Sequence, residues 1–139
     1  LFAGTGGLGI EALSRGAGHA VFVDASPKSV AVVRSNLEAT RLADRAEVYR
    51  NDAGKAIRLL EKKGLKFDLL FLDPPYIMKD CAERLLDLAA RGLVAEGATA
   101  VVEHESAFDY GDGFGPFRRR RHATYGEVAL SIYRYEGEA

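Results

Sequence analysis

Short apolar runs alternate along the chain with segments in which apolar residues recur every three or four positions. Runs rich in β-branched and aromatic residues predict strands, whereas the longer spacing predicts helices with one apolar face. The predicted strands are residues 1–3, 20–23, 46–49, 67–72 and 99–103. Helical segments separate them, which indicates parallel strands joined by right-handed crossovers.

The helical segments carry recognisable ends. Ser26 is predicted to cap a helix that has Pro27 at its first position. Residues 53–63 and 80–91 are predicted to form two further helices, with Ile57 and Leu60 on the inner face of the first. The regular alternation of strand and helix stops after Glu103.

The last part of the chain has a different pattern. A glycine-rich stretch, 108–115, is predicted to be a loop, and residues 117–122 and 127–135 are predicted to form a β-hairpin because the second segment alternates strictly. We therefore predict an α/β fold, doubly wound, whose mainly parallel seven-stranded sheet ends in a C-terminal antiparallel hairpin. Residues 1–3 resemble the end of a strand, so the first strand is expected to be truncated at the N-terminus.

A glycine-rich turn follows the first predicted strand. It satisfies G-x-G-x-x-G through Gly4, Gly6 and Gly9, which lets a ligand approach the backbone at a helix N-terminus. Asp24 follows the second strand, where a carboxylate can accept hydrogen bonds from both hydroxyls of a ribose. The pair fits either a nicotinamide or flavin dinucleotide or S-adenosylmethionine. A glycine turn that serves packing alone is the remaining alternative.

Asn51 and Asp52 follow the third predicted strand. The Asp52 carboxylate can accept a hydrogen bond from an adenine amino group, and the amide of Ala53 can meet a ring nitrogen. Adenine recognition by a side chain after this strand favours a methyltransferase. Alternatively, Asp52 caps the helix that begins at Ala53, and the two roles are compatible.

The fourth predicted strand ends in Asp73, Pro74, Pro75 and Tyr76. A planar –NH₂ group donates two hydrogens, so a pocket that holds it needs two acceptors in defined positions. The Asp73 carboxylate can be one, and the Pro74 carbonyl, in a backbone stiffened by two prolines, can be the other. Tyr76 offers a face on which a base can stack. We predict that these four residues are catalytic; a tight turn after a buried strand is the alternative.

Four stretches of the chain resemble one enzyme family. They read "LFAGTGGLGIEALSRGA", "FVD", "LFLDPPY" and "TYGEVALSIY". They are similar to the bacterial 16S ribosomal RNA (guanine-N2)-methyltransferase family (RsmD-like), within the amino-methyltransferases that carry an Asp-Pro-Pro-Tyr motif. The resemblance implies a Rossmann-like methyltransferase fold and a methyl transfer from S-adenosylmethionine to the N2 amine of a guanine in 16S ribosomal RNA. The substrate would be the RNA itself or the assembled small ribosomal subunit.

The resemblance also implies roles for individual residues. The implied cofactor contacts are Phe2, Ala3, Gly4, Gly6, Asp24, Asp52 and Ala53, and the implied holders of the guanine amine are Asp73, Pro74 and Tyr76. A basic segment that the family carries ahead of residue 1 is expected to be missing. Three alternatives are open: N-methylation of adenine or of a protein glutamine amide, a dinucleotide-dependent oxidoreductase, and an RNA-binding module without catalysis.

Composition and charge restrict the kinds of molecule that the protein can bind. The 139 residues are 47% hydrophobic and 28% charged, which fits a single globular domain over residues 1–139. A net charge of −1 gives no support to nucleic-acid binding through bulk charge. An RNA surface therefore has to be local, and the predicted phosphate contacts are Arg118, Arg119, Arg120 and Arg121. A solvated strand is the alternative for this run.

The remaining signals exclude several classes of protein. A single cysteine, Cys81, rules out a disulfide framework and a thiolate metal cage, and fits the cytoplasm. No apolar run approaches the roughly 20 residues of a membrane span. Glu103 and His104 are expected to be an exposed strand end. We thus expect a cytoplasmic monomer without a metal ion or a membrane anchor.

Overall fold

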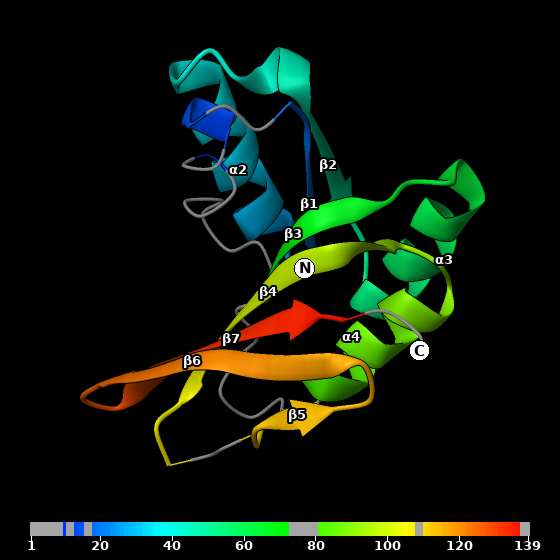
Figure 1. Ribbon diagram of the computed structural model, residues 1–139. Helices are drawn as coiled ribbons and strands as arrows, with labels where there is room; N and C mark the ends of the chain where they lie inside the picture. Colours follow the sequence, from blue (N-terminus) through cyan, green and yellow to red (C-terminus); the bar gives the residue numbers. More distant parts are fainter. Residues whose placement is uncertain (1–9, 11–12, 16–17, 73–80, 108–109, 137–139) are drawn as a thin grey trace. The chain divides into compact units, whose positions relative to one another are not determined.

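The computed structural model describes residues 10, 13–15, 18–72, 81–107 and 110–136 (Figure 1). The chain forms two compact units, Leu1–Ala56 and Ile57–Ala139, and the boundary between them lies within helix α3 (Ala53–Lys63). Within the described ranges, no helix is long and apolar enough to cross a membrane.

The first unit contains two parallel strands. They are β1 (Ala20–Asp24) and β2 (Ala46–Arg50), connected through α2 (Pro27–Ala39) and the short 3₁₀ helix η1 (Ala43–Arg45). The register pairs Ala20 with Ala46 and Asp24 with Arg50, so the two strands end at the same edge.

Helix α2 begins as the sequence predicts. The Ser26 hydroxyl accepts a hydrogen bond from the amide of Ser29 at 3.3 Å, and Pro27 is the first helical residue. One side of the helix is buried through Val30, Val33 and Leu37, which lie three and four positions apart. The core cluster of this unit comprises Leu13, Phe22, Val33 and Leu37, with Ile10, Ala20, Leu42, Ala46 and Val48 packed against it.

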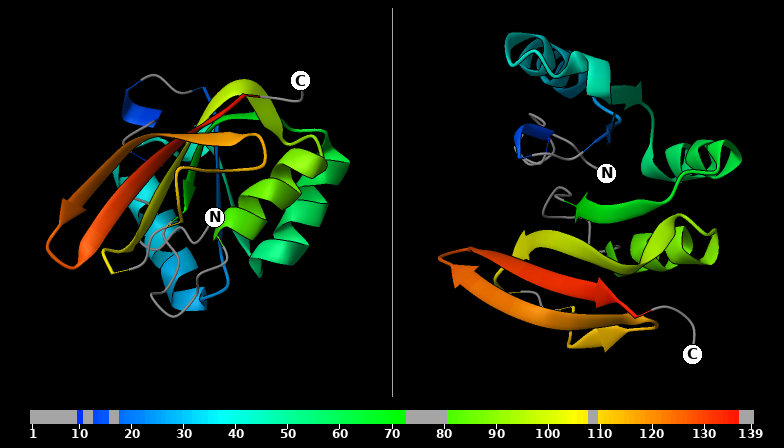
Figure 2. Two further views of the ribbon diagram at one scale, coloured as in Figure 1. Left: turned by 60° about the horizontal axis from the view of Figure 1, so that its bottom comes forward. Right: turned by 45° about the horizontal axis from the view of Figure 1, so that its top comes forward.

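The second unit is built on a five-stranded sheet. Its elements are β3 (Phe67–Leu72), α4 (Cys81–Ala90), β4 (Val94–Glu105), β5 (Gly113–Phe114), β6 (Phe117–Tyr125) and β7 (Val128–Tyr135). The strand order is β3-β4-β7-β6-β5, in which β3 and β4 are parallel and the other neighbours are antiparallel. Strands β6 and β7 run side by side as a long hairpin (Figure 2), and Gly126 in its turn has a positive φ of 63°, which glycine adopts without strain.

These pairings correct the predicted sheet. The described residues form a two-stranded and a five-stranded sheet, with two parallel and three antiparallel strand pairs, rather than one mainly parallel sheet of seven strands. The α/β class and the C-terminal hairpin are confirmed. The added antiparallel pairing comes from β5, in a stretch predicted to be a loop, because two residues after Asp112 suffice to pair with Phe117 and Arg118.

One face of the five-stranded sheet is buried. Strand β4 alternates regularly, with Ala98, Ala100, Val102 and His104 buried and the residues between them partly exposed. The register continues this face onto β7 through Ala129, Ser131 and Tyr133, each of which has 0% of its surface exposed. A histidine and a serine therefore lie on a sheet face that is otherwise mainly apolar.

An ion-pair cluster joins the two helices of this unit. The Arg91 guanidinium donates to the carboxylates of Asp87 at 2.8 Å and Glu61 at 3.1 Å. The hydrogen bond with Asp87, more than the one with Glu61, raises the pKa of Arg91 above its usual value. The cluster connects the end of α4 to α3 on the surface.

Candidate functional site

Asp24 lies at the carboxyl end of β1, and local hydrogen bonds hold its position. Its Oδ1 accepts from the amide of Ser26 at 2.9 Å, which closes a tight turn directly before α2. Its main-chain carbonyl accepts from the amide of Asn51 at 3.1 Å. The backbones at the ends of β1 and β2 are therefore tied together, and one carboxylate oxygen of Asp24 has a defined direction.

Asp52 lies at the same edge, two residues beyond the end of β2. Its Oδ1 accepts from the amide of Lys55 at 2.9 Å, so it caps α3. Its side chain is 55% exposed, and Oδ2 lies 3.9 Å from the Lys55 Nζ. The capping role that the sequence left open is thus present, and binding of adenine by Asp52 and by the Ala53 amide stays a prediction.

The chemistry of this edge fits an adenosine group. Two carboxylates and the N-terminus of α3 lie at the carboxyl edge of a parallel strand pair, which is where ligands bind in open α/β sheets. Carboxylates accept hydrogen bonds from ribose hydroxyls and from an adenine amine, and free amides donate to a ring nitrogen. The structure brings Asp24 and Asp52 to one edge, as the strand pattern predicts.

The other predicted site residues lie outside the described residues. They are Phe2, Ala3, Gly4 and Gly6 at the glycine-rich turn and Asp73, Pro74, Pro75 and Tyr76 after β3. The structure describes β3 up to Leu72, which is buried and pairs with Val102 of β4. The roles predicted for these eight residues stay predictions.

The arginine run on β6 divides into residues with different partners. Arg118 and Arg120 both approach the Glu136 carboxylate, at 3.4 and 3.8 Å. Arg119 pairs with Asp112 at 2.8 Å, and its side chain is only 14% exposed. Arg121 is exposed and forms no ion pair with the residues that the structure describes.

A bulge in β6 explains why the side chains of the four arginines do not simply alternate between the two faces of the sheet. The β6–β7 register shifts between Arg119 and Arg121, so that Arg119 is opposite Tyr133 and His122 is opposite Ser131. Both Arg119 and His122 therefore face the same side of the sheet as Ser131 and Tyr133. RNA binding by the four arginines stays a prediction, and Arg121 is the member best placed for it.

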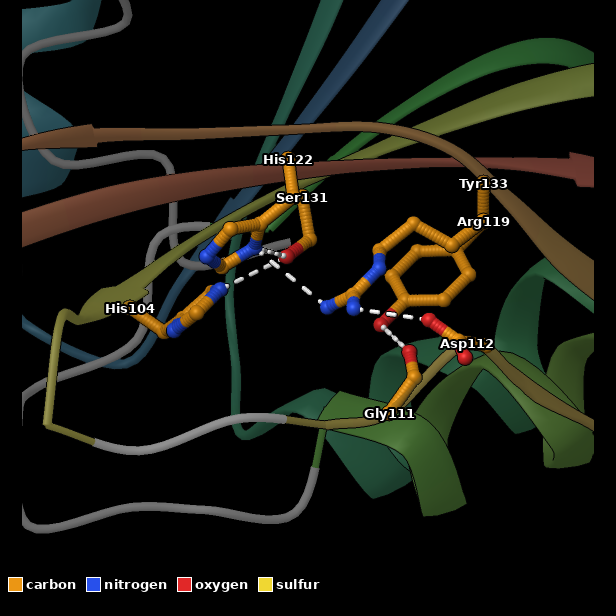
Figure 3. A network of polar contacts seen from close by, with 7 residues as sticks. All are labelled: His104, Gly111, Asp112, Arg119, His122, Ser131 and Tyr133. Atoms are coloured by element: carbon orange, nitrogen blue, oxygen red, sulfur yellow. Dashed lines mark hydrogen bonds and ion pairs between the residues drawn. The ribbon is translucent and has the colours of Figure 1, made fainter.

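Sequence reasoning missed a cluster of polar side chains on the buried face of the five-stranded sheet (Figure 3). His104 has 5% of its surface exposed, so the expectation that it is an exposed strand end is wrong. Its Nδ1 lies 2.9 Å from the Glu105 carbonyl, and its Nε2 lies 2.8 Å from Ser131 Oγ. The alternation of Ala100, Val102 and His104 along β4 was the signal that could have placed it inside.

The cluster extends onto β6 and onto the chain that precedes β5. Ser131 Oγ also lies 3.0 Å from His122 Nδ1, and Arg119 Nη1 approaches the same nitrogen at 3.3 Å. The Tyr133 hydroxyl donates to the carbonyl of Gly111 at 2.8 Å. Among the residues that the structure describes, no three His, Cys, Asp or Glu side chains lie together in a way that could hold a metal ion.

Comparison with known proteins identifies the family. The model of the family described as "Conserved hypothetical protein 95" matches residues 1–134. The chain belongs to this family. The "Putative rRNA methyltransferase YlbH" of Bacillus subtilis is 39% identical over 137 residues, which cover 99% of this chain and 74% of that protein.

Solved structures support the same placement. A "conserved hypothetical protein" of Streptococcus pyogenes has a TM-score of 0.91 at 33% identity, and the match covers 99% of this chain and 84% of that one. The "Putative methyltransferase yhhF" of Escherichia coli has a TM-score of 0.81 at 31% identity and covers 99% and 73%. The proteins similar to this chain thus include ones named as methyltransferases.

A more distant structure shares the fold. It is an RNA methyltransferase of Salinibacter ruber in complex with S-adenosyl-L-homocysteine, with a TM-score of 0.66 at 17% identity over 99% of this chain and 79% of that one. The fold is therefore that of a methyltransferase-like α/β protein. The narrower resemblance to 16S guanine-N2 methyltransferases stays a prediction.

Proposed function

We propose that this chain is an S-adenosylmethionine-dependent ribosomal RNA methyltransferase, and that its acceptor is the exocyclic N2 amine of a guanine in 16S RNA. The observation that supports this most directly is the shared edge of Asp24 and Asp52 on the β1–β2 pair. The family membership and the relative named as an rRNA methyltransferase agree with it. The motif Asp73, Pro74, Pro75 and Tyr76 adds the amine-binding half.

Each carboxylate of the β1–β2 edge has a role in binding adenosine. Asp24 accepts from the ribose hydroxyls, because its turn with Ser26 holds the carboxylate at the strand end. Asp52 accepts from the adenine amine while its other interactions cap α3. Phe2, Ala3, Gly4 and Gly6 complete the cofactor contacts in this proposal, as the resemblance implies.

The chemistry at Asp73 requires alignment more than a strong base. Bound S-adenosylmethionine supplies a methyl group that is activated by the positive charge on sulfur. The Asp73 carboxylate and the Pro74 carbonyl accept the two hydrogens of the amine, which localises the nitrogen lone pair and stabilises the positive charge that develops on it. Nitrogen gains the bond to carbon as the carbon–sulfur bond breaks, and one amine proton then leaves to water. Tyr76 stacks on the base, which has to be unstacked from the RNA to reach the pocket.

RNA phosphates are bound by the arginine run in this proposal. Arg121 has no carboxylate partner among the described residues, and Arg118 and Arg120 share the single carboxylate of Glu136. Arg118, Arg120 and Arg121 thus have only the Glu136 carboxylate as an ion-pair partner among the described residues. Their remaining positive charge can bind RNA phosphates. Arg119 contributes less, because Asp112 already neutralises it.

Two titrations test the cofactor. Calorimetry should show binding of S-adenosylhomocysteine and no binding of NADH. The reverse result, with NADH bound and S-adenosylhomocysteine ignored, would identify a dinucleotide-dependent oxidoreductase and contradict the proposal.

Product mapping tests the acceptor. The protein is incubated with methyl-labelled S-adenosylmethionine and unmethylated 16S RNA or small subunits, and the modified nucleotide is mapped. We expect N2-methylguanine, and we expect Asp73→Ala to lower kcat by about 10²–10³-fold with the affinity for S-adenosylhomocysteine retained. A product on adenine or on a glutamine amide would contradict the guanine assignment. Equal activity of Asp73→Ala would contradict the proposed catalytic site.

A further inference from the structure

The cluster consists of His104, Ser131 and Tyr133, which are buried, Arg119, which is partly buried, and His122, which is exposed. The hydrogen bonds of His104 have a defined direction. A carbonyl only accepts, so His104 Nδ1 must carry the proton that it shares with the Glu105 carbonyl. In neutral His104 the Nε2 is then an acceptor, and the Ser131 hydroxyl donates to it. Ser131 Oγ also lies 3.0 Å from His122 Nδ1, a nitrogen that the Arg119 guanidinium, which only donates, approaches as well. The Ser131 hydroxyl of β7 therefore donates to His104 of β4, and His104 has one assigned tautomer.

The cluster holds three consecutive residues, 110–112, which we call the anchored segment. The ring of Tyr110 meets the ring of His104 edge-on, with 5.3 Å between centroids. The Tyr133 hydroxyl donates to the carbonyl of Gly111. Arg119 binds Asp112 twice, through its amide to the carbonyl at 2.7 Å and through its guanidinium to the carboxylate at 2.8 Å. Figure 3 shows the side chains of Tyr133 and Arg119 contacting Gly111 and Asp112.

The strand register places His104 at the edge of the sheet where the proposed chemistry occurs. Leu72, the last described residue of β3, pairs with Val102 in the parallel β3–β4 ladder, and His104 lies two residues farther along β4. In the sequence Leu72 is followed directly by Asp73. His104 and the Tyr110 ring against it therefore lie at the carboxyl edge of this strand pair, where ligands of open α/β sheets bind.

A purely structural role does not account well for the choice of side chains. Along β4 and β7, the other buried residues of this face are alanines, Val102 and Tyr133. Apolar side chains in place of His104 and Ser131 would fill it without the cost of burying polar groups. A satisfied polar network, in contrast, defines the orientation of every ring in it. His104 uses its two nitrogens for Glu105 and Ser131, so neither is available to accept a proton from substrate.

We propose that His104 and Ser131 are positioning residues for the acceptor nucleotide. They hold the Tyr110 ring and the anchored segment at the carboxyl edge of β3–β4, and this segment receives the RNA nucleotide beside the target amine. The proposal rests on the proposed methyltransferase function. Because the adenosine-binding carboxylates are on β1–β2, loss of the cluster affects the RNA and leaves cofactor affinity unchanged.

The test compares the wild-type protein with three variants of buried residues. Ser131→Ala removes the hydroxyl that joins the two histidines, and His104→Gln retains an oxygen that can accept from Ser131. Val94→Ala is the matched control, since it shortens a buried side chain on the same strand that pairs with Phe67 and with no residue of the cluster. Each protein is assayed for methyl transfer to 16S RNA, for S-adenosylhomocysteine affinity and for exchange of the Arg119 amide, which closes onto Asp112.

We expect Ser131→Ala to raise KM for RNA roughly fivefold to tenfold, the effect of one lost buried hydrogen bond. Exchange of the Arg119 amide should accelerate by a similar factor, and affinity for S-adenosylhomocysteine should stay within twofold of wild type. His104→Gln should raise KM for RNA less than Ser131→Ala does, because its side-chain oxygen can still accept from the Ser131 hydroxyl. Nitrogen chemical shifts should show His104 protonated on Nδ1 in both proteins, with the Nε2 signal displaced in Ser131→Ala because the hydroxyl that donates to it is lost.

The outcomes separate this proposal from the proposed function. If the wild type methylates RNA and Ser131→Ala has the same KM, the positioning role is overturned and the function stands. If Val94→Ala raises KM as much as Ser131→Ala does, the effect is general loss of packing and the positioning role is again overturned. If the wild type binds no S-adenosylhomocysteine and methylates no RNA, the proposed function itself fails and the positioning role fails with it.

Discussion

The carboxylates at the β1–β2 edge and the polar cluster of the five-stranded sheet are held by contacts of different range. Asp24 bonds to an amide two residues away and Asp52 to one three residues away. In the cluster, Ser131 is 27 residues from His104 and 9 from His122, and Tyr133 is 22 residues from Gly111. The first set is partly or largely exposed, whereas His104, Ser131 and Tyr133 are buried.

This difference has energetic consequences. A local cap or turn at the surface contributes about 1 kcal/mol and survives changes elsewhere, because its partners are neighbours in the chain. A buried polar group left without its partner costs about 1–3 kcal/mol, and it keeps that partner only while the sheet is correctly assembled. Substitutions of Asp24 or Asp52 should therefore lower ligand affinity and leave the fold stable. Substitutions in the cluster should lower the stability of the protein and loosen the anchored segment.

The largest expected effect is a loss of stability when a buried aromatic side chain is removed from either of the two hydrophobic cores. Phe117 has no exposed surface and packs against Phe114 and Tyr135, with ring centroids 5.5 and 5.3 Å away. Phe117→Ala should lower the free energy of unfolding by about 3–5 kcal/mol, and Phe22→Ala in the first unit by a similar amount. Urea unfolding measures both values, and a loss below about 1 kcal/mol in either would contradict the burial. Hydrogen exchange then shows whether Phe117→Ala loosens only β6 and β7 or also β1 and β2.

The second test concerns ligand affinity at the β1–β2 edge. Asp24→Ala should weaken binding of S-adenosylhomocysteine by about 10–100-fold, because hydrogen bonds to a charged group contribute about 1.5–3 kcal/mol. Calorimetry measures the affinity. Asp44→Ala is the matched control, since Asp44 is an exposed carboxylate in η1, just before the amino end of β2 and at the opposite end of that strand from Asp52. An equal loss in both variants would show that overall charge, rather than the Asp24 position, decides the affinity.

The third test isolates one long-range hydrogen bond of the cluster. Tyr133→Phe removes the hydroxyl that donates to the Gly111 carbonyl and should lower the free energy of unfolding by about 1–2 kcal/mol. Tyr125→Phe makes the same chemical change at a side chain that is 61% exposed and should stay within about 0.5 kcal/mol of wild type. Thermal unfolding of both variants checks the contrast. Identical melting temperatures would mean that the Tyr133 hydroxyl does not stabilise the anchored segment.

The smallest expected effect separates two arginines of the same run. Arg121→Ala should reduce the slope of log affinity for RNA against log salt by about one unit, because one phosphate contact is lost. Arg119→Ala should leave that slope nearly unchanged, since Asp112 already pairs with the guanidinium, but should loosen the anchored segment. Filter binding at several salt concentrations gives the slopes. Equal slopes for the two variants would contradict the division of the run.

Much of the local structure could be predicted from the sequence. Helix α3 has the predicted bounds of 53–63, and Ser26 and Pro27 start α2 as expected. Strand β4 was predicted too short, at 99–103 instead of Val94–Glu105. Gly97 lies within β4 with a positive φ of 79°. It does not end the strand, because β3 pairs with β4 on both sides of it: Phe67 pairs with Val94 and Leu69 pairs with Thr99, with a shift of register between them.

The candidate site divides in the same way. Asp24 and Asp52 could be placed at one edge because parallel strands all end on the same side, and that rule needs no knowledge of packing. The sequence shows four consecutive arginines, but it does not show which of them form ion pairs. A bulge changes the direction of Arg119, and the carboxylates that pair with the arginines are distant in the chain. His104 was misplaced because its position at the end of a strand received more weight than the alternation of β4.

The order of residues alone determined the features whose causes are local: the α/β class, the helix caps, the strand-end carboxylates and the terminal hairpin. These follow from backbone preferences and from periodicity within about ten residues. Tertiary structure alone decided which strands pair antiparallel, which arginines are neutralised, and that His104, Ser131 and His122 meet. Those outcomes depend on contacts between residues far apart in the chain, and a hydrogen bond of that kind exists only after the sheet has brought both partners out of water and within about 3 Å of each other.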